Sequence, residues 1–348
     1  MNARMVPVLL GIISTILLLA GFYFADEIFA PVACALFIIA IAWPLQERLQ
    51  ARLPQLLALA IVVTLIMLVF IVFASVVAWG FGRVGRSLIA ETPRLQGLYE
   101  QATAWLETHG IAVAGLWAEH FNMRWVVGAV QGLSVRLNTM ISFWIVVLIY
   151  VLLGLLEVGP VARRIPGIVS SEAARVLIMG SNRTAAKLRR YLMIRTIMSI
   201  ATGAMVYVFA LALGLQLAAE WGVIAFTLNF IPFIGPFIAT LLPTFYALAQ
   251  FESLYSALFV FACLNLIQFV IGSYVEPRMA GKALALSPFL ALFSVFLWMF
   301  LWGLFGAFIG VPITIAAVTF CAQSPSAEWL SHLLGAPDDG EAKDPSAV

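Results

Sequence analysis

The polar side chains of the C-terminal half that could do chemistry are few, and apolar sequence surrounds each of them. Asn229 lies three residues before Pro232, while Asn265 and Gln268 are three residues apart and so share one face of a helix. Arg195 and Glu276 are ionisable side chains near the ends of apolar stretches. Burying amides or charges is unfavourable unless they find partners. These residues predict a site that binds a polar solute and moves charge.

Glu276 and Arg195 are predicted to carry the charge-handling step. Glu276 directly precedes Pro277, and it can pair with Arg195 or Arg278 or accept a coupling proton. A carboxylate that moves between a cation and an apolar setting changes its proton affinity in opposite directions, which a proton-coupled carrier requires. The alternative for Arg195 is that its long side chain reaches out to the membrane interface.

Each amide has two interpretations. Pro232 lacks a backbone donor and clashes with the carbonyl four residues earlier, which opens the backbone around Leu228 and Asn229. Asn229 then adds an amide to a site of freed carbonyl groups, or it caps the helix that follows. Asn265 and Gln268 either line a polar path or join neighbouring helices, at about 0.6–2 kcal/mol per hydrogen bond. We predict that all three amides line the solute path.

Other chemistries find no support in the sequence. It contains no nucleophile elbow, phosphate loop or zinc motif, so we do not expect an enzyme. The three cysteines lie inside apolar runs and are expected to be small core residues, and the three histidines lack metal-ligand spacing. We therefore expect no metal, no other cofactor and no nucleic-acid partner.

Composition shows which elements must position these side chains. Hydrophobic residues form 63% of the chain and charged residues 10%, against about 45–50% and about 25% in soluble domains. A membrane-spanning helix needs about 20 apolar residues, and the charge-free windows are 5–25, 28–46, 53–82, 137–156, 196–219, 221–251, 253–275 and 283–327. The sequence predicts an all-α polytopic membrane protein with about eight membrane segments.

Two of these windows are broken at mid-run by proline and glycine. They carry Asn229-Phe-Ile-Pro-Phe-Ile-Gly-Pro236 and Gly303-Leu-Phe-Gly-Ala-Phe-Ile-Gly-Val-Pro312, which share a Phe-Ile-Gly echo. A membrane tolerates broken backbone only where protein or a water-filled cavity receives the freed polar groups, and paired broken segments point to a transport site. We predict two broken or re-entrant hairpins whose tip residues contact solute through backbone, namely Pro232, Gly235, Pro236, Gly306 and Gly310. The spacing of Gly303, Gly306 and Gly310 also suits close helix packing.

Six regions follow from this pattern of charge and polarity. They are three N-terminal membrane segments (1–82), an amphipathic extracytoplasmic helical region (83–136), a fourth span (137–158), a basic cytoplasmic helical region (159–190), a transport core with both hairpins (191–327) and an acidic disordered tail (328–348). Region 159–190 holds seven cations against one acid. Short loops rich in Lys and Arg face the cytoplasm.

This rule sets the expected orientation. Placing 159–190 in the cytoplasm puts Asp26 and Glu27 outside and the N-terminus inside. If 221–251 crosses the membrane fully, the loop holding Arg278 and Lys282 lies outside, against the rule. If that run returns to the outside as a hairpin, this loop lies inside. We predict the hairpin arrangement, with both termini cytoplasmic.

The C-terminal motifs resemble a known family. Together with Val275-Glu-Pro-Arg-Met-Ala-Gly-Lys-Ala-Leu-Ala-Leu-Ser-Pro288, the two broken segments are similar to signatures of the autoinducer-2 exporter family of bacterial inner-membrane permeases. The resemblance covers nearly the whole chain in the order of spans and is specific in the C-terminal half. Ser287 departs from it, because the family often has histidine before this proline.

The resemblance implies a function, a location and an assembly. It implies a multi-pass protein of the bacterial inner membrane that exports small solutes such as autoinducer-2, with monovalent cation/proton antiport in some members. It also implies a homo-oligomer, with pentamers described. From residues and resemblance together we predict a secondary transporter exporting an autoinducer-2-like solute, coupled to a proton or monovalent cation gradient. The alternatives are a neutral-solute channel and a non-transporting membrane scaffold.

Overall fold

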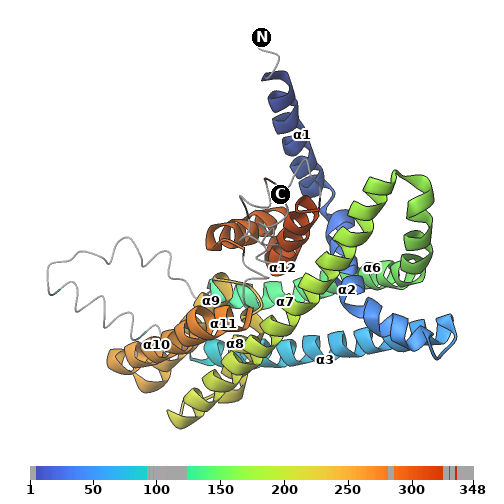
Figure 1. Cartoon of the computed structure of the whole chain (residues 1–348). Helices are drawn as coiled ribbons and strands as arrows, with labels where there is room; N and C mark the ends of the chain where they lie inside the picture. The colour runs from blue at the N-terminus through green and yellow to red at the C-terminus, as the bar shows by residue number, and fades with distance from the viewer. Residues whose placement is uncertain are drawn as a thin grey trace, which may run out of the picture. The chain divides into compact units, whose positions relative to one another are not determined.

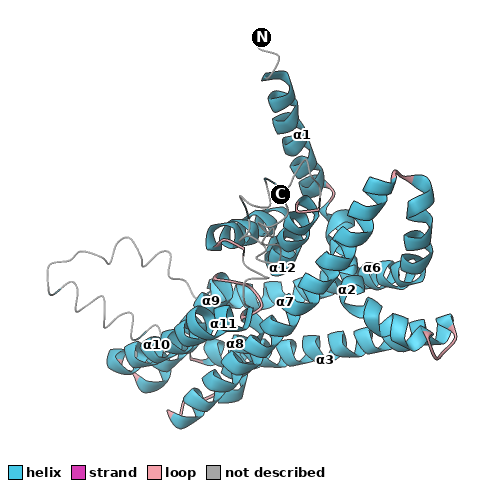
Figure 2. Cartoon of the chain, in the orientation of Figure 1, coloured by secondary structure: helices cyan, strands magenta, loops and turns pink. Residues whose placement is uncertain are grey.

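The molecule is built from helices, as its sequence predicts. The computed structural model describes residues 5–91, 124–280 and 286–323, with the single residues 94, 97, 108, 329 and 334. The regular elements in these ranges are helical (Figures 1 and 2), and seven of them are long and apolar enough to cross a membrane. The all-α polytopic membrane fold is therefore confirmed. Most of the predicted 83–136 region and nearly all of the acidic tail lie outside the described residues.

The chain divides into two compact units, each assembled from segments that are distant in sequence. Unit 1 contains Met1–Ile66, Ser142–Met193 and Ala280–Val348, and unit 2 contains Met67–Ile141 and Ile194–Met279. Three helices contribute to both units: α3 (Gln55–Ala90), α6 (Arg124–Ile168) and α7 (Ser171–Ala212). The two broken segments therefore belong to different units.

These three helices are much longer than a membrane crossing requires. They contain 36, 45 and 42 residues, against about 20 for one crossing. They continue through four of the predicted region boundaries, at 82/83, 136/137, 158/159 and 190/191. A change of side-chain polarity does not end a helix, because its backbone hydrogen bonds stay satisfied along its length.

In unit 1, α1 (Met5–Phe24) and α2 (Asp26–Gln50) are separated by the single non-helical residue Ala25. The two helices meet at a bend (Figure 1). Asp26 and Glu27, expected between two spans, lie in the first turn of α2. Negative side chains are favourable there because the helix N-terminus is partly positive.

Helix α12 (Pro288–Cys321) of unit 1 is a hairpin rather than one straight helix. Trp302 and Gly303 leave helical geometry, with φ −129° and 64° respectively. Glycine suits this left-handed φ because it has no Cβ. The Oγ atom of Ser294 lies 2.6 Å from Oγ1 of Thr314, so the two halves lie side by side. The predicted break at Gly303 is confirmed.

The other predicted hairpin forms the centre of unit 2. It consists of α8 (Ala218–Leu228) and α9 (Ile234–Phe251), which pack against each other. The side chain of Gln250 accepts from the backbone N–H of Gln216 and donates to the carbonyl of Gly214, both at 2.9 Å. The segment before α8 and the end of α9 therefore lie together, and the break at 229–233 is the turn between them.

The rest of unit 2 surrounds this hairpin. Helix α10 (Leu254–Phe269) packs on α9 and continues through a π-helix, η1 (Val270–Val275), into α11 (Glu276–Ala280). The apolar core holds buried side chains from α7, α8, α9 and α10, with Trp221 and Tyr246 the largest among them. This packing brings α7 and α10, which carry candidate polar residues, against the hairpin.

Candidate functional site

Arg195 and Glu276 form an ion pair within unit 2. Nη1 of Arg195 lies 2.6 Å from Oε1 of Glu276, and the two side chains are 7% and 27% exposed. Glu276 begins α11 directly after η1 and before Pro277. Proline cannot donate to the preceding turn and crowds its carbonyls, and π-turns are often found at functional sites. Of the two partners predicted for Glu276, the structure selects Arg195.

Arg278 makes a different contact. Its guanidinium carbon lies 3.9 Å from the centroid of the Tyr274 ring. Arginine and tyrosine attract in this arrangement because the ring face is negative. Arg278 is exposed, so it remains a usable position for testing the orientation of the loop.

Asn229 lies at the turn of the first hairpin and reaches α7. Its Nδ2 donates to Oγ of Ser199 at 3.2 Å, and both residues are buried. Asn229 is the C-cap residue of α8, while Phe233 holds the N-cap position of α9. The interpretation of Asn229 as the cap of the second helix is therefore wrong, and the amide serves a contact between elements.

The turn itself is tight. Phe233 has φ 63° and ψ −57°, and the N–H of Ile234 donates to the carbonyl of Pro232 at 2.7 Å. These values describe a γ-turn, a rare and strained conformation. A Cβ atom on Gly235 would overlap the carbonyl oxygen of Leu228. Only glycine at this position therefore allows the start of α9 to lie so close to the end of α8. Pro236 lies in the first turn of α9, where a missing N–H costs little.

Gly306 and Gly310 perform the packing role in the second hairpin. A Cβ on Gly306 would overlap the carbonyl oxygen of Trp298, and one on Gly310 would lie 3.0 Å from that of Ser294. Both glycines are buried. The close-packing interpretation therefore agrees with the structure at Gly306 and Gly310 but not at Gly303, where an added Cβ would meet no atom within 4 Å. The contact of Gly306 and Gly310 with solute stays a prediction.

Asn265 and Gln268 lie on α10 without contacting Asn229. Asn265 is exposed, and its Nδ2 donates to the carbonyl of Phe261 in its own helix at 2.8 Å. The Nε2 of Gln268 is buried and has no hydrogen-bond partner among the described residues. The structure therefore does not join these two amides to the hairpin turn through hydrogen bonds.

Helix α7 carries polar residues that sequence reasoning missed. Ser199 and Thr202 follow Arg195 at four and seven residues, so the three share one helical face, and all three are buried. The four-residue step from Arg195 to Ser199 could have revealed this stripe. One turn of α7 thus separates the ion pair with Glu276 from the hydrogen bond to Asn229.

Three buried polar atoms of unit 2 have no hydrogen-bond partner in the part of the chain that the structure describes. They are Nε of Arg195, Oγ1 of Thr227 and Nε2 of Gln268. An unpaired buried polar atom costs about 1–3 kcal/mol. Such atoms are therefore available to a polar solute or to water. Thr227 was not predicted as a site residue.

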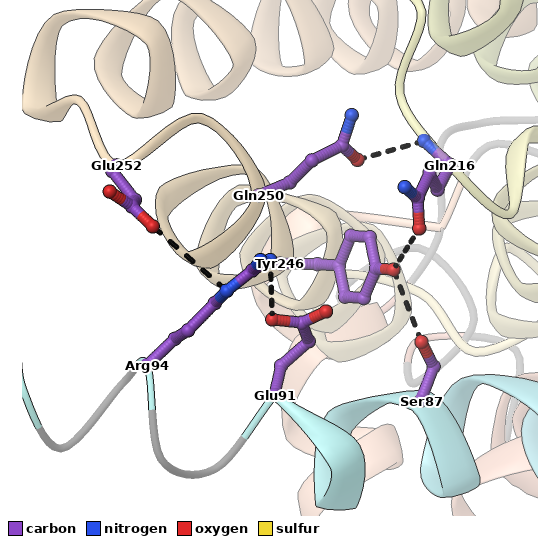
Figure 3. Close-up of polar contacts among 7 residues, drawn as sticks. All are labelled: Ser87, Glu91, Arg94, Gln216, Tyr246, Gln250 and Glu252. Carbon is purple, nitrogen blue, oxygen red and sulfur yellow. Dashed lines mark hydrogen bonds and ion pairs between the residues drawn. The ribbon is translucent and has the colours of Figure 1, made fainter.

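A second polar network lies at the open end of the first hairpin (Figure 3). The hydroxyl of Tyr246 lies 3.1 Å from Oγ of Ser87 and donates to Oε1 of Gln216 at 3.1 Å. Arg94 contacts Glu91 at 3.1 Å and Glu252 at 3.9 Å. The sequence did not single out this network, because its members are distant in the chain and lie at element ends.

Metal ligation is not indicated in the described ranges. They contain no group of three His, Cys, Asp or Glu side chains that could hold a metal ion. Cys34, Cys263 and Cys321 are free thiols.

Comparison with known proteins identifies the family of this chain. The family model described as "AI-2E family transporter" matches residues 12–325. The chain is 29% identical over 338 residues to "AI-2 transport protein TqsA" of Escherichia coli, covering 96% of each protein. It is 27% identical to a "Putative transport protein" of Haemophilus influenzae, covering 97% of this chain and 99% of the relative. It is 26% identical to "Putative transport protein YhhT" of E. coli, covering 94% of each. The chain belongs to the AI-2E family of transporters.

Proposed function

We propose that this protein is a secondary transporter that exports a small polar solute of the autoinducer-2 type across the bacterial inner membrane. The observation that carries this proposal is the α7 stripe, in which Ser199 binds Asn229 and Arg195 binds Glu276 one turn away. An amide offered to the solute and an ion pair, both in contact with one face of α7, suit a coupled carrier. The relative named "AI-2 transport protein TqsA" supports the choice of solute class.

The solute path runs past the turn of the first hairpin. Asn229, Gln268 and the unpaired Oγ1 of Thr227 offer both donors and acceptors. Asn265 on α10 contributes a further amide when its Nδ2 donates to the solute instead of to the carbonyl of Phe261. Backbone at Pro232, Gly235 and Pro236 in the turn of the first hairpin completes this part of the path. In the second hairpin, Gly306 and Gly310 remain predicted solute contacts. The unpaired buried atoms support this assignment, since a solute would satisfy them.

Coupling rests on Glu276 and Arg195. The distance between Nη1 of Arg195 and Oε1 of Glu276 is 2.6 Å, and both side chains are largely shielded from solvent. Separating the two side chains therefore leaves a buried charge without its counter-ion. Breaking a buried pair by losing one partner costs about 3–5 kcal/mol. A proton or a monovalent cation that binds the Glu276 carboxylate removes the carboxylate's share of that cost, which links the movement to an ion gradient.

The membrane orientation follows the charge pattern. Both termini, the basic 159–190 region and the loop with Arg278 face the cytoplasm, and the first hairpin returns to the outside. The hydrogen bonds of Gln250 to Gly214 and Gln216 support a returning hairpin. Helix α8 has 11 residues and is about 16 Å long, shorter than the hydrocarbon core of about 30 Å.

Flux in proteoliposomes tests this function. Purified protein is reconstituted, and movement of autoinducer-2 is measured with and without an imposed pH gradient. A coupled carrier saturates with solute and accumulates it when the gradient is present. Flux that neither saturates nor responds to the gradient indicates a channel, and flux equal to that of empty vesicles indicates a scaffold. Either outcome contradicts the proposal.

A further inference from the structure

A second ion pair, with one buried partner, lies in unit 2, and the proposed coupling does not use it. Nη1 of Arg83 on α3 lies 2.9 Å from Oε1 of Glu220 in the first turn of α8. The Glu220 side chain is 4% exposed and that of Arg83 is 50% exposed. Glu220 is therefore held in the protein interior, while the guanidinium approaches it from the surface. Arg83 also lies 5.7 Å from the ring centroid of Trp79.

The residues around Arg83 form one face of α3 against the hairpin. Gly80 and Ser87 precede and follow Arg83 by three and four residues, which places all three on one side of the helix. A Cβ on Gly80 would lie 3.0 Å from Cγ1 of Val223. Oγ of Ser87 lies 3.1 Å from the hydroxyl of Tyr246 (Figure 3). This face of α3 therefore contacts both helices of the hairpin near their open end.

Towards the turn of the hairpin the contacts with α3 are aromatic instead. The ring of Phe73 lies 6.1 Å from that of Phe226 and 6.2 Å from that of Phe230, with steep interplanar angles. Such ring pairs are worth about 0.5–1.5 kcal/mol beyond the area they bury. The charged and hydroxyl contacts described between α3 and the hairpin lie towards its open end.

The hairpin is attached to α7 in a different way. A Cβ on Gly203 would lie 2.7 Å from the carbonyl oxygen of Gly222, and one on Gly222 would lie 2.9 Å from that of Gly203. Backbones this close interlock and resist separation. The hydrogen bond between Asn229 and Ser199 adds to this attachment. The hairpin is therefore attached to α7 mainly by close backbone contact and to α3 mainly by side-chain contacts.

We propose that Arg83 and Glu220 form a latch that closes the open end of the α8–α9 hairpin against α3 and opens once in each transport cycle. This inference rests on the proposed transport function. Glu220 lies in the first turn of α8 and Asn229 caps its C-terminal end, so the latch lies about 14 Å along the helix from the predicted solute contact. The Arg195–Glu276 pair acts at the end of the hairpin that carries its turn, and the latch acts at the opposite, open end. Arg83 and Glu220 are positioning residues that do not touch the solute.

A disulfide across this interface tests the latch directly. The Cβ of a residue at position 80 would lie 3.5 Å from Cβ of Val223, within the range of about 3.5–4.5 Å that disulfides require. In a background without the three native cysteines, Gly80→Cys/Val223→Cys should cross-link on mild oxidation. We expect oxidation to lower autoinducer-2 exchange by about tenfold or more, and dithiothreitol to restore it. Each single-cysteine variant under the same oxidant is the matched control. Full exchange by the cross-linked protein would overturn the latch.

The rate of cross-linking provides a readout that does not depend on transport. Adding Glu220→Gln or Arg83→Gln to the cysteine pair should slow disulfide formation in membranes by roughly fivefold, because removing one partner of the pair lets α3 and α8 separate more often. The exposed Glu157→Gln is the control and should leave the rate unchanged. An unchanged rate in the Glu220 and Arg83 variants overturns the latch. Absence of exchange in the parent protein would instead count against the proposed function.

Discussion

Ser199 accepts a hydrogen bond from Asn229 at 3.2 Å, one turn of α7 beyond the arginine that pairs with Glu276 at 2.6 Å. This relationship connects the turn of a broken hairpin with a buried ion pair through a single helix. Under the proposed function, a movement of the hairpin turn reaches the pair through this face of α7. The first two predictions separate the roles of these two contacts.

Replacing Glu276 with Gln should abolish gradient-driven accumulation while sparing solute exchange. Glutamine keeps the shape of the side chain and can still accept from Arg195, but it cannot bind and release a proton. The measurement is autoinducer-2 uptake into proteoliposomes with a pH gradient, compared with counterflow without one. Glu157→Gln, at an exposed position of α6, serves as the control. Wild-type accumulation by the Glu276 variant would make this carboxylate a structural partner of Arg195 only.

Replacing Asn229 with Ala should weaken transport both with and without the gradient. The change removes the donor to Ser199 and leaves that hydroxyl buried, at a cost of about 1–3 kcal/mol. Ser199→Ala should reproduce part of the loss, because it removes the same contact from the other side. Asn182→Ala, on an exposed part of α7, tests whether any asparagine substitution has this effect. Unaltered exchange in Asn229→Ala would remove this amide from the solute path.

Replacing Gly306 with Ala should destabilise the protein. The added methyl group would overlap the carbonyl of Trp298, and overpacking of this kind costs about 1–3 kcal/mol. Thermal unfolding in detergent should show a lower midpoint temperature. The matched control is Gly11→Ala in α1, where an added Cβ meets no atom within 4 Å and the helix propensity improves by about 0.5–1 kcal/mol. Equal midpoints for the two variants would show that the second hairpin is loosely packed.

A cysteine at Arg278 should resist membrane-impermeant thiol reagents in intact cells. The proposed returning hairpin places this exposed residue in the cytoplasm. A cysteine at Glu252, which is 66% exposed at the open end of the hairpin, should react readily in the same assay. Both measurements use a background without native cysteines. Ready labelling at 278 would mean that the 221–251 run crosses the membrane completely.

The protein should be a homo-oligomer in mild detergent, with five copies as the expected number. Many large apolar side chains are exposed on a single chain, including Phe24 and Tyr255 at more than four-fifths of their surface. Lipid and neighbouring copies are the partners that such surfaces accept. Native mass measurement checks the number, and a spectrum of monomers alone would contradict the assembly.

Much of the fold follows from local sequence. The helices lie where apolar runs predict them, and the two breaks fall beside Pro232 and at Gly303, whereas Pro312 lies inside a helix. Glu276 and Arg195 were recognisable because charges are scarce in the apolar C-terminal half. Sequence similarity between the hairpins was less informative. The Phe-Ile-Gly echo aligns Gly235 with Gly310, whereas the glycine that crowds a carbonyl beside each turn is Gly235 in one hairpin and Gly306 in the other.

The sequence by itself determined the helical membrane class, the two broken hairpins and the few polar residues available to a transport site. These depend on hydrophobicity and backbone conformation, which are local properties. Only the tertiary structure decided that Glu276 pairs with Arg195, that Asn229 binds Ser199 and that Glu220 binds Arg83. Each of these contacts joins residues at least 30 positions apart in the chain. Such pairings depend on how helices pack, because several partners are chemically equivalent and only packing brings one within hydrogen-bonding distance.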